Sequence, residues 1–256
     1  MSWGVERRGD VVLVTMRSNP VNRMNPAFFD DLHQALDTVE AQHPTLPLVL
    51  TAEGSTFSAG LDFDDAFPRF ARNDSTETRA WFDRFRATLL RVFTLPRRTV
   101  AAINGHAFAG GLILAVSCDY RIAATGPARF AINEVPVGIP MPATYTEMVR
   151  YAAGSRAASE AILGGQAYGV EAALALGFLH QVVRPEQLLD TALTQAGLIS
   201  PDSFSAYAVS KQILLRPTLE RIRASQELDE LAMQTVMSPD SVRAQKAAFA
   251  RLKKKP

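Results

Sequence analysis

The sequence is poor in cysteine. Its 256 residues contain a single one, Cys118. One thiol cannot form an internal disulfide, which excludes a disulfide-stapled fold and favours a reducing compartment. The only histidine in the same stretch is His106, so we expect Cys118 to be a small buried hydrophobic side chain rather than a nucleophile.

Long hydrophobic runs and an excess of charge are also absent. No stretch approaches the ~18 consecutive apolar residues of a membrane span, and residues 1–6 are neither basic nor apolar enough for a signal peptide. The formal net charge is +1, and no basic stripe alternates with aromatic residues. We therefore expect no membrane or nucleic-acid partner, and the cytoplasm is the default location.

The chain does contain enough apolar residues, 47%, for a large core. Strand-like and helix-like segments alternate to about residue 195, which predicts an α/β fold with a parallel sheet over 1–195, and only helical patterns follow over 196–256. Strands are expected at 11–16, 48–52, 99–103, 119–124, 130–132 and 181–183. Helices are expected at 26–40, 78–93, 143–151, 155–163, 170–176, 188–198, 203–214, 218–237 and 239–253, and a loop or broken helix at 62–75.

Two strand-to-loop junctions are rich in small residues. One follows strand 99–103 and places Gly110 and Gly111 where an apolar helix should begin. The other follows strand 48–52 and runs through 53–62. A helix N-terminus has free N–H groups and partial positive charge, and glycine allows close approach of a ligand. Two converging N–H donors can form an oxyanion hole. The alternative is that both junctions are ordinary packing turns.

Three ordered motifs within residues 48–140 resemble those of the crotonase (enoyl-CoA hydratase/isomerase) superfamily. They are FSAGLD at 57–62, the junction at 104–111 with CDYRI at 118–122, and FAINE at 130–134 with VGIP at 137–140. A weaker likeness runs from residue 11 to about 183. The resemblance implies a crotonase-like spiral of strand–strand–helix repeats. It also implies C-terminal helices that mediate oligomer contacts in a homotrimer or a hexamer built as a dimer of trimers.

The resemblance further implies an acyl-CoA substrate whose thioester oxyanion is held by two backbone N–H groups. By position these belong to Leu61 and Gly110. Coenzyme A enters as part of the substrate, so no separate cofactor and no metal are expected. The implied substrate-binding positions are Asn22, Arg23, Met24, Phe57, Ser58, Ala59, Gly60, Gly111 and Ile113. Arg23, and Lys253 across a trimer contact, are the candidate phosphate partners.

The carboxylates distinguish two reactions. The resemblance implies that hydratases use one glutamate three residues after the oxyanion-hole glycine and another at the Asn133-Glu134 position, where this chain has Ile113 and Glu134. Two carboxylates can hold a water and share the acid and base roles. A single carboxylate can instead carry a proton from C2 to C4 through a stabilised dienolate. The pattern is similar to that of 3-enoyl-CoA to trans-2-enoyl-CoA isomerases, with Glu134 as proton shuttle.

Several alternatives stay open. Glu134 could be a solvent-exposed loop carboxylate, although its apolar neighbours favour an enclosed site. The chain could be a hydratase or another crotonase enzyme whose second acid comes from Asp64, Asp65 or Glu147. It could also be a non-catalytic acyl-CoA-binding protein, since fold does not fix function.

The other residues of the motifs have structural interpretations. We expect Asp62 to cap a helix, Asp119 and Arg121 to form an ion pair or backbone contacts, and His106 to be structural. Aromatic residues expected in the core or the pocket wall are Phe63, Phe67, Phe70, Trp81, Phe82 and Phe85.

Overall fold

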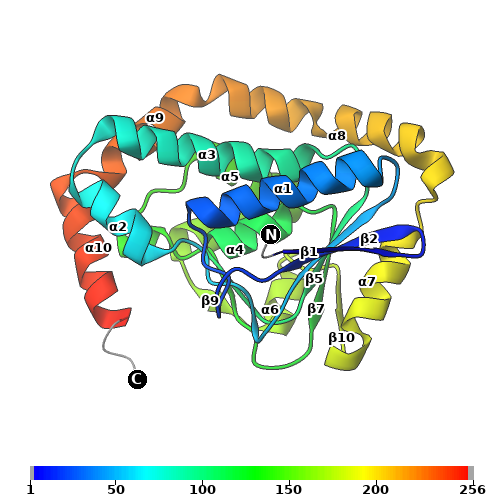
Figure 1. The fold of residues 1–256 in the computed structure, drawn as a ribbon. Coiled ribbons are helices and arrows are strands. Elements are labelled where there is room, and N and C mark those ends of the chain that lie inside the picture. Colours follow the sequence, from blue (N-terminus) through cyan, green and yellow to red (C-terminus); the bar gives the residue numbers. More distant parts are fainter. Residues whose placement is uncertain (1–2, 253–256) are drawn as a thin grey trace.

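A six-stranded sheet forms the centre of the molecule within residues 3–252, the part of the chain that the computed structural model describes (Figure 1). Its order is β1-β2-β3-β5-β7-β10, formed by Gly4–Arg8, Val11–Met16, Leu48–Ala52, Thr99–Ile103, Tyr120–Ala124 and Gln181–Val183. β1 pairs antiparallel with β2, and the later neighbours pair in parallel. The prediction of an α/β fold built on a parallel sheet is confirmed.

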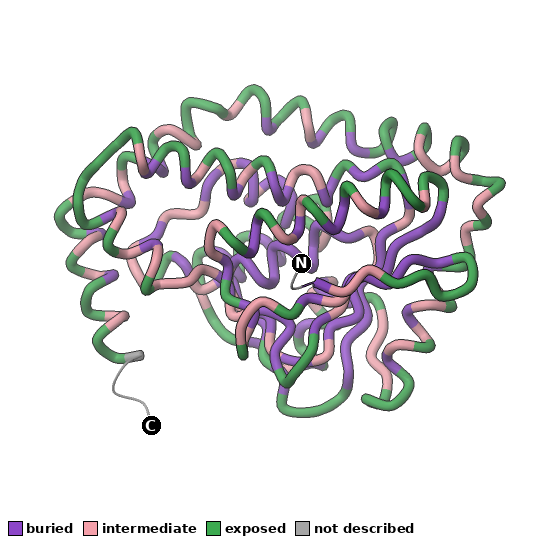
Figure 2. The backbone as a smooth tube through the Cα atoms, in the orientation of Figure 1, coloured by how far each residue is buried: buried purple, intermediate pink, exposed green. Residues whose placement is uncertain are grey.

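Alternate residues of this sheet pack into two cores. On β2, Val12 and Val14 belong to the larger core and Val11 and Leu13 to the smaller one, because successive strand residues point to opposite faces. The smaller core is closed by α7, Leu188–Gly197. Figure 2 shows the strands buried along most of their length. Burial of both faces explains why these strands are nearly continuous apolar runs.

A second, four-stranded sheet has the order β4-β6-β8-β9. Its strands are Thr56–Ser58, His106–Phe108, Phe130–Ala131 and Ala167–Tyr168. In turn, β4, β6 and β8 each follow a strand of the first sheet, namely β3, β5 and β7, and each is followed by a helical segment. This recurring strand–strand–helix unit is the spiral that the family resemblance implied.

The helices surround the sheets on several sides. They are α1 Pro26–Gln42, α2 Phe63–Ala71, α3 Ser75–Thr94, α4 Gly110–Val116, α5 Ala143–Gly164, α6 Val170–Ala175, α7, α8 Phe204–Ala224, α9 Gln226–Val236 and α10 Pro239–Leu252, with short 3-10 turns η1 Val135–Val137, η2 Pro185–Gln187 and η3 Pro201–Ser203. α8 runs along the top of Figure 1, and α10 lies at the opposite end from α7, against α2. Within residues 3–252, no helix combines the length and the apolar character needed to cross a membrane.

Two expected helix boundaries were wrong. α8 continues through Pro217 to Ala224, and the break before α9 falls at Ser225. Pro217 removes one backbone hydrogen bond, but it is exposed, so water can reach the freed carbonyl, while Leu215 and Ile222 keep the helix packed against the core.

Residues 62–75, expected to be a loop or a broken helix, form a broken helix. α2 and α3 meet at Asn73, which has a φ of 55°. The expected break at Gly154 is present as a kink inside α5. The strands β4, β6 and β9 were not predicted, because each has only two or three residues, too few for a periodic pattern. The five-residue β1 was not predicted either, because it ends in three charged, exposed residues.

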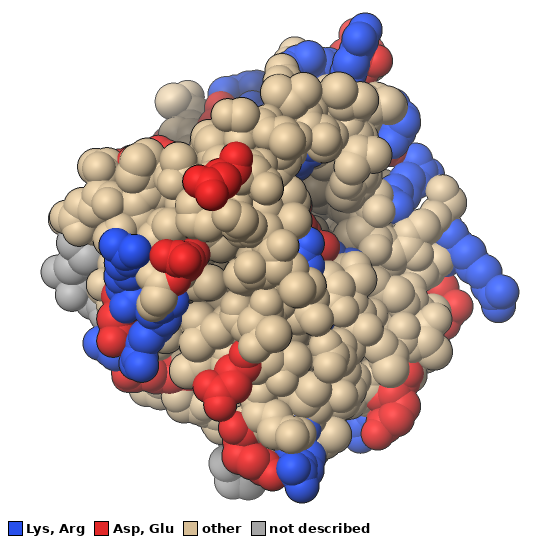
Figure 3. All heavy atoms as spheres, turned by 90° about the vertical axis from the view of Figure 1, so that its right-hand side faces the viewer, with Lys and Arg blue, Asp and Glu red and all other residues tan. Residues whose placement is uncertain are grey.

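Several large apolar side chains are exposed on the C-terminal helices. Exposed large apolar side chains on α8 and α9 are Val209, Ile213, Leu214, Leu228 and Leu231. Figure 3 shows the face at the right-hand side of Figure 1, where α7 and the start of α8 lie; uncharged residues make up most of its middle.

Asp119, at the start of β7, ties α8 to the central sheet. Its carboxylate accepts hydrogen bonds from the Thr99 backbone N–H and hydroxyl and from the Tyr207 hydroxyl, all at 2.9 Å, and pairs with Lys211 Nζ at 2.8 Å. The expected pairing with Arg121 is therefore not the main one. The Arg121 guanidinium instead donates to backbone carbonyls that include Phe178 and Cys118, as the alternative interpretation had it.

We expect Asp119→Ala to lower the free energy of unfolding by about 3 kcal/mol, because it leaves the ammonium of Lys211 buried without a counter-charge. The Lys211 side chain is 6% exposed. Urea unfolding followed by circular dichroism measures the change. Asp10→Ala is the matched control, since it removes an exposed pair with Arg7 and should cost below about 1 kcal/mol. Equal losses in the two variants would contradict the anchoring role.

Candidate active site

Three loops meet at one edge of the second sheet. They follow β4, β6 and β8, and they carry residues 59–62, 109–110 and 132–134. β4 pairs in parallel with β6, and β6 in parallel with β8. Because the carboxyl ends of neighbouring parallel strands emerge at the same edge, the loops that follow them are neighbours as well. The topology thus gathers segments that are about 70 residues apart in the sequence.

The first two loops touch through glycine. A Cβ at Gly60 would lie 2.6 Å from the Phe108 carbonyl oxygen and 3.2 Å from the Gly110 nitrogen, and the φ of Gly60 is +79°. A Cβ at Gly111 would lie 2.3 Å from the Ser58 carbonyl oxygen. Any larger residue would push the loops apart, so glycine is required for this backbone approach.

The N–H group of Leu61 points away from Met24, its partner in an isolated parallel bridge. Met24 N–H donates to the Gly60 carbonyl at 2.8 Å, and Asp62 N–H donates to the Met24 carbonyl at 3.0 Å. In a parallel bridge of this kind the residue between the two bonded neighbours directs its own N–H to the opposite side. The Leu61 donor is therefore left for another acceptor.

The N–H group of Gly110 is free for a different reason. Gly110 is the first residue of α4, where backbone donors have no acceptor within the helix. Ala109 before it has φ 51° and ψ −125°, a conformation that non-glycine residues rarely adopt. The Ala109 N–H is fixed to the Ala131 carbonyl at 2.7 Å, so the turn into α4 is anchored on β8. The Leu61 and Gly110 donors thus lie on touching segments.

Glu134 supplies the carboxyl group of the site. It is 8% exposed, and its Oε2 has no hydrogen-bond partner among residues 3–252. Burial raises the pKa of this carboxyl from 4.5 to about 7, with backbone groups of Glu134 and Asn133 opposing the rise. This burial excludes the alternative that Glu134 is a solvent-exposed loop carboxylate. A carboxyl with this pKa can accept and return a proton near neutral pH.

The loop of Glu134 is held from two sides. The Glu134 carbonyl accepts hydrogen bonds from Val137 N–H at 3.1 Å and Ile139 N–H at 3.0 Å. Gly138 packs against α10 so closely that a Cβ there would lie 2.8 Å from the Ser241 carbonyl oxygen. The C-terminal helix therefore helps to fix the catalytic candidate.

The surroundings of the free N–H groups are apolar. Ile113, one turn into α4, is 1% exposed. A Cβ at Gly110 would lie 2.9 Å from Phe85 Cζ and 3.0 Å from Met24 Sδ.

The three candidate second acids have cationic partners: Glu147 pairs with Arg150 and Arg221, Asp65 with Arg69, and Asp64 with Arg23. Within residues 3–252, no charged side chain contributes to the raised pKa of Glu134.

The positions implied for coenzyme A divide into buried and accessible ones. Met24, Phe57, Ser58 and Asn22 are at most 1% exposed. Asn22 donates to the Thr56 carbonyl and accepts from Ser18 N–H, and Ser58 donates to the Asn22 carbonyl, so these side chains hold the loops together.

Arg23 and Ala59 remain partly accessible beside them. The Arg23 side chain is 47% exposed and lies 3.4 Å from Asp64. Lys253, the second candidate phosphate partner, lies outside the described residues.

Other polar residues of the motifs have structural partners, as expected. Asp62 caps α2 by accepting from Asp64 N–H at 3.2 Å. His106 Nδ1 accepts from Arg129 N–H at 3.1 Å. Cys118 is buried, which raises the pKa of its thiol to about 12, so no thiolate forms at neutral pH.

Sequence reasoning missed one residue near the site. Tyr145 of α5 is 3% exposed, and its ring centroid lies 5.1 Å from that of Phe85. Its hydroxyl has no hydrogen-bond partner among the described residues. Only its place near the start of a predicted helix marked it in the sequence, and that gives no sign of what the helix faces.

Comparison with known proteins identifies the family. The sequence profile of the enoyl-CoA hydratase/isomerase family matches residues 6–256. The chain is 32% identical to a putative enoyl-CoA hydratase of Thermus thermophilus over 81% of each chain. It is 29% identical to human mitochondrial enoyl-CoA delta isomerase 1 over 91% of this chain and 76% of the relative.

The chain is also similar to a solved structure of an isomerase. The crystal structure of human mitochondrial delta3-delta2-enoyl-CoA isomerase superposes with a TM-score of 0.89, at 27% identity, over 99% of this chain and 98% of the other. The fold and the matched profile lead to one conclusion: this chain is a member of the enoyl-CoA hydratase/isomerase family, within the crotonase superfamily.

Proposed function

We propose that the protein is an enoyl-CoA delta isomerase that converts 3-enoyl-CoA to trans-2-enoyl-CoA. The observation that carries the proposal is Glu134, a buried carboxyl with a pKa of about 7 and an oxygen that has no hydrogen-bond partner among the described residues. The position where hydratases are expected to place a second glutamate is the buried Ile113. The 29% identity to a human enoyl-CoA delta isomerase supports the same reaction.

In this mechanism the thioester oxygen accepts hydrogen bonds from the N–H groups of Leu61 and Gly110. The Glu134 carboxylate removes a proton from C2, and the released electron pair spreads over the thioester and the C3–C4 double bond as a dienolate. The two donors stabilise the negative charge on the oxygen. Neutral Glu134 then returns the proton to C4, which leaves the double bond between C2 and C3.

The enclosed setting supports this role. The apolar side chains of Phe85, Met24 and Ile113 exclude water from the neighbourhood of the oxyanion donors. Exclusion of water strengthens the hydrogen bonds to the oxyanion and disfavours addition of water to the product. Arg23 is the proposed contact for a phosphate of coenzyme A, which takes part only as the substrate's carrier.

We also propose a homotrimer, or a hexamer formed from two trimers. The support is the apolar stripe of the C-terminal helices. Val209 and Ile213 are four residues apart on α8, and Leu228 and Leu231 are three residues apart on α9, so each pair lies on one helix face. All four are more than half exposed.

Glu134→Gln is expected to lower the isomerisation rate by about 100-fold or more, because the amide cannot accept the C2 proton. Binding of acyl-CoA should persist, since the oxyanion donors are backbone groups. The rate is measured from the ultraviolet absorbance of the conjugated 2-enoyl thioester, and binding by calorimetry with a saturated acyl-CoA.

The exposed Glu160→Gln is the matched control and should leave the rate unchanged. Hydration of crotonyl-CoA is assayed in parallel. Hydration as the main activity would overturn the isomerase assignment in favour of the hydratase alternative. Acyl-CoA binding without turnover of either substrate would favour the binding-protein alternative.

The pH dependence should report the raised pKa directly. Glu134 must be ionised to act as a base, so kcat/KM is expected to rise with pH and level off above an apparent pKa of about 7. The profile is measured between pH 5 and 9, about two pH units on each side of that pKa. A profile that is nearly level across this range, as expected for a carboxyl that titrates near the usual glutamate value of 4.5, would show that Glu134 is not desolvated.

The free energy of unfolding should fall over the same pH range in which kcat/KM rises. The pKa of Glu134 is higher in the folded than in the unfolded chain, so this group favours folding below pH 4.5 and loses that contribution as the pH rises to about 7. Glu134→Gln, uncharged throughout, should therefore be more stable than wild type at pH 8, by on the order of 3 kcal/mol, with no such advantage at pH 4.5. Thermal unfolding at both pH values tests this, and an equal difference at the two would contradict it.

A further inference from the structure

Helices α1 and α3 each support one of the two proposed oxyanion donors. Met24, two residues before α1, forms the parallel bridge with Leu61. Phe85 of α3 lies against Gly110, where an added Cβ would come within 2.9 Å of its ring. The spacing of the two donors therefore depends on how α1 and α3 pack against each other.

The contact between α1 and α3 is aromatic at one end and polar one turn further along. Phe29 of α1 packs on Phe85 and Trp81 of α3, with 5.4 Å and 6.1 Å between ring centroids. His33 follows Phe29 by four residues, so it lies on the same face of α1. Thr88 likewise follows Phe85 by three residues on α3. A change in the polar contact therefore acts on the rings beside the oxyanion turn.

The polar contact is built on Arg91 of α3. Its guanidinium donates to His33 Nδ1 at 3.0 Å and to the His33 carbonyl at 3.3 Å. It also pairs with Asp37 at 2.6 Å and with Glu40 at 2.8 Å. This Arg91 tether, made of Arg91, His33, Asp37 and Glu40, has a half-buried imidazole at its inner end and two exposed carboxylates at its outer end.

The hydrogen bonds around His33 require the neutral form of its ring. The Thr88 hydroxyl donates to the Arg84 carbonyl at 2.7 Å, so its oxygen accepts from His33 Nε2 at 3.0 Å. Nε2 thus carries the ring proton, and Nδ1 accepts the Arg91 N–H. A second proton would have to bind at Nδ1. There it would remove the hydrogen bond and place two positive charges side by side.

The charges that face His33 act in opposite directions. Burial and the guanidinium of Arg91 lower the pKa of the imidazole from 6.5, and Asp37 of α1 raises it. Arg84 of α3 pairs with Asp30, about one turn earlier. β1 also packs on α1, but in the described part of the chain none of its charges contributes to this pKa shift. His33 is therefore neutral at pH 8 and takes up a proton below pH 6.5.

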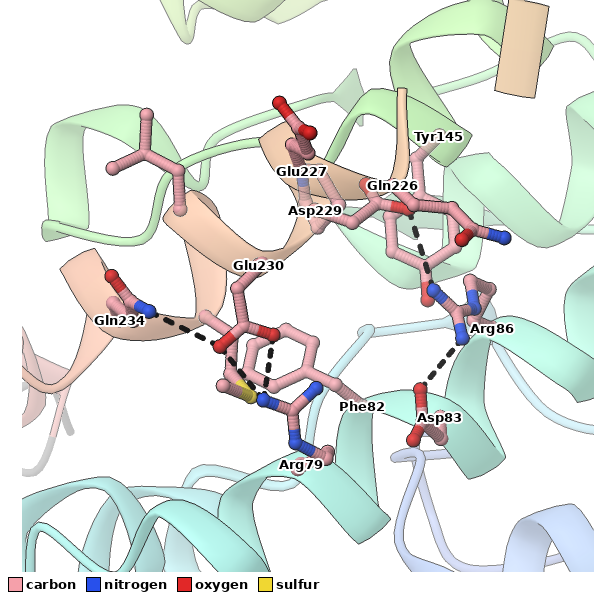
Figure 4. A pocket seen from close by; sticks show the side chains of 13 residues that line it. Arg79, Phe82, Asp83, Arg86, Tyr145, Gln226, Glu227, Asp229, Glu230 and Gln234 are labelled. Carbon is pink, nitrogen blue, oxygen red and sulfur yellow. Dashed lines mark hydrogen bonds and ion pairs between the residues drawn. The ribbon is translucent and has the colours of Figure 1, made fainter. Parts of the chain in front are cut away.

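The other side of α3 lines a cavity. Phe82, Asp83 and Arg86 border about 670 Å³ that α3 shares with α9 and the start of α5 (Figure 4). A close-packed interior resists displacement of a helix, whereas a helix with a cavity on one side can shift toward it. α3 can therefore move away from α1 without overlapping another element.

We propose that the Arg91 tether is a positioning device that keeps the Leu61 and Gly110 donors at the spacing an oxyanion needs, and that acid loosens it by protonating His33. Arg91 then keeps its outer carboxylate partners, α3 shifts toward the cavity, and the ring beside Gly110 moves with the helix. Arg91 and His33 act through the two helices and not by touching substrate, so they are positioning residues. This role rests on the proposed function, because it needs an oxyanion between the two donors.

Substitutions compared at one pH separate the charge of His33 from the titration of Glu134. At pH 8, His33→Lys should lower kcat for isomerisation about tenfold, less than the roughly 100-fold of a lost oxyanion donor, because the donors are displaced and not removed. KM should change less than about twofold, since the oxyanion forms only in the transition state. His33→Gln should keep kcat within about twofold of wild type, because an amide offers a donor and an acceptor and binds no proton.

Tryptophan fluorescence measures the helix contact without any reaction. The chain has two tryptophans, so Trp3→Phe leaves Trp81, which packs on Phe29 between α1 and α3. Its emission should change in one transition with a midpoint below pH 6.5, while far-ultraviolet circular dichroism stays constant. His33→Gln in the same background should remove the transition. His33→Lys should show the acid emission already at pH 8.

His43→Gln is the matched control, because His43 is the C-terminal cap of the same helix and is not part of the Arg91 tether. This variant should keep the wild-type kcat and the wild-type fluorescence transition. Wild-type kcat in His33→Lys, or a fluorescence transition that persists in His33→Gln, overturns the proposal.

The two measurements also separate the tether from the proposed reaction. A transition in Trp81 emission that His33→Gln removes would support the acid-loosened tether while the isomerase assignment fails. An active isomerase whose Trp81 emission does not respond to His33→Lys would leave the isomerase assignment standing and overturn the tether.

Discussion

The close approach of two backbone turns is the constraint on which the site depends. Gly60 lies so near the second turn that a single added methyl group would collide with the Phe108 carbonyl oxygen and the Ala109 Cβ. Because of this approach, the segments that carry Leu61 and Gly110 touch, although the two residues belong to different turns of the spiral. The approach also explains the conformation of Ala109, whose φ of 51° costs on the order of 1–3 kcal/mol. The parallel pairing of β4, β6 and β8 holds the turns in place and so maintains this strained junction.

Burial makes the Glu134 carboxylate a stronger base and costs stability at the same time. Burial raises the pKa of its carboxyl because water no longer solvates the charged form. A carboxylate in the same place on the surface would be a weak base at neutral pH. α10 packs on the loop of Glu134 at Gly138, so the C-terminal helical region takes part in forming the site as well as in covering the core. Residues 1–195 and 196–256 are therefore not independent in this respect.

Much of this arrangement could be predicted from the sequence. The strands of the large sheet are apolar runs of five or six residues for the most part, and the ordered motifs placed Leu61, Gly110 and Glu134 on loops after successive strands. What could not be predicted depends on tertiary contacts. Pro217 does not end α8, because packing of its neighbours outweighs the lost hydrogen bond. Short strands such as β4 are defined by their partners rather than by composition. The cavity lined by Arg86 of α3, Tyr145 of α5 and Met233 of α9 arises from helices about 60 to 150 residues apart in the sequence, and no local pattern records their contact.

Ile113 connects the geometry to the choice of reaction. It follows Gly110 by three residues on α4, so it lies on the same helix face as the proposed oxyanion donor. A carboxylate there would add a second negative charge to an enclosed space, and one of the two acids would remain protonated at neutral pH. Such a pair can bind water and divide the acid and base roles. With an aliphatic side chain in that place, the protonation of Glu134 is governed by its own burial and by nearby backbone groups. In the proposed mechanism, one base that can both remove and return a proton favours migration of a double bond over addition of water.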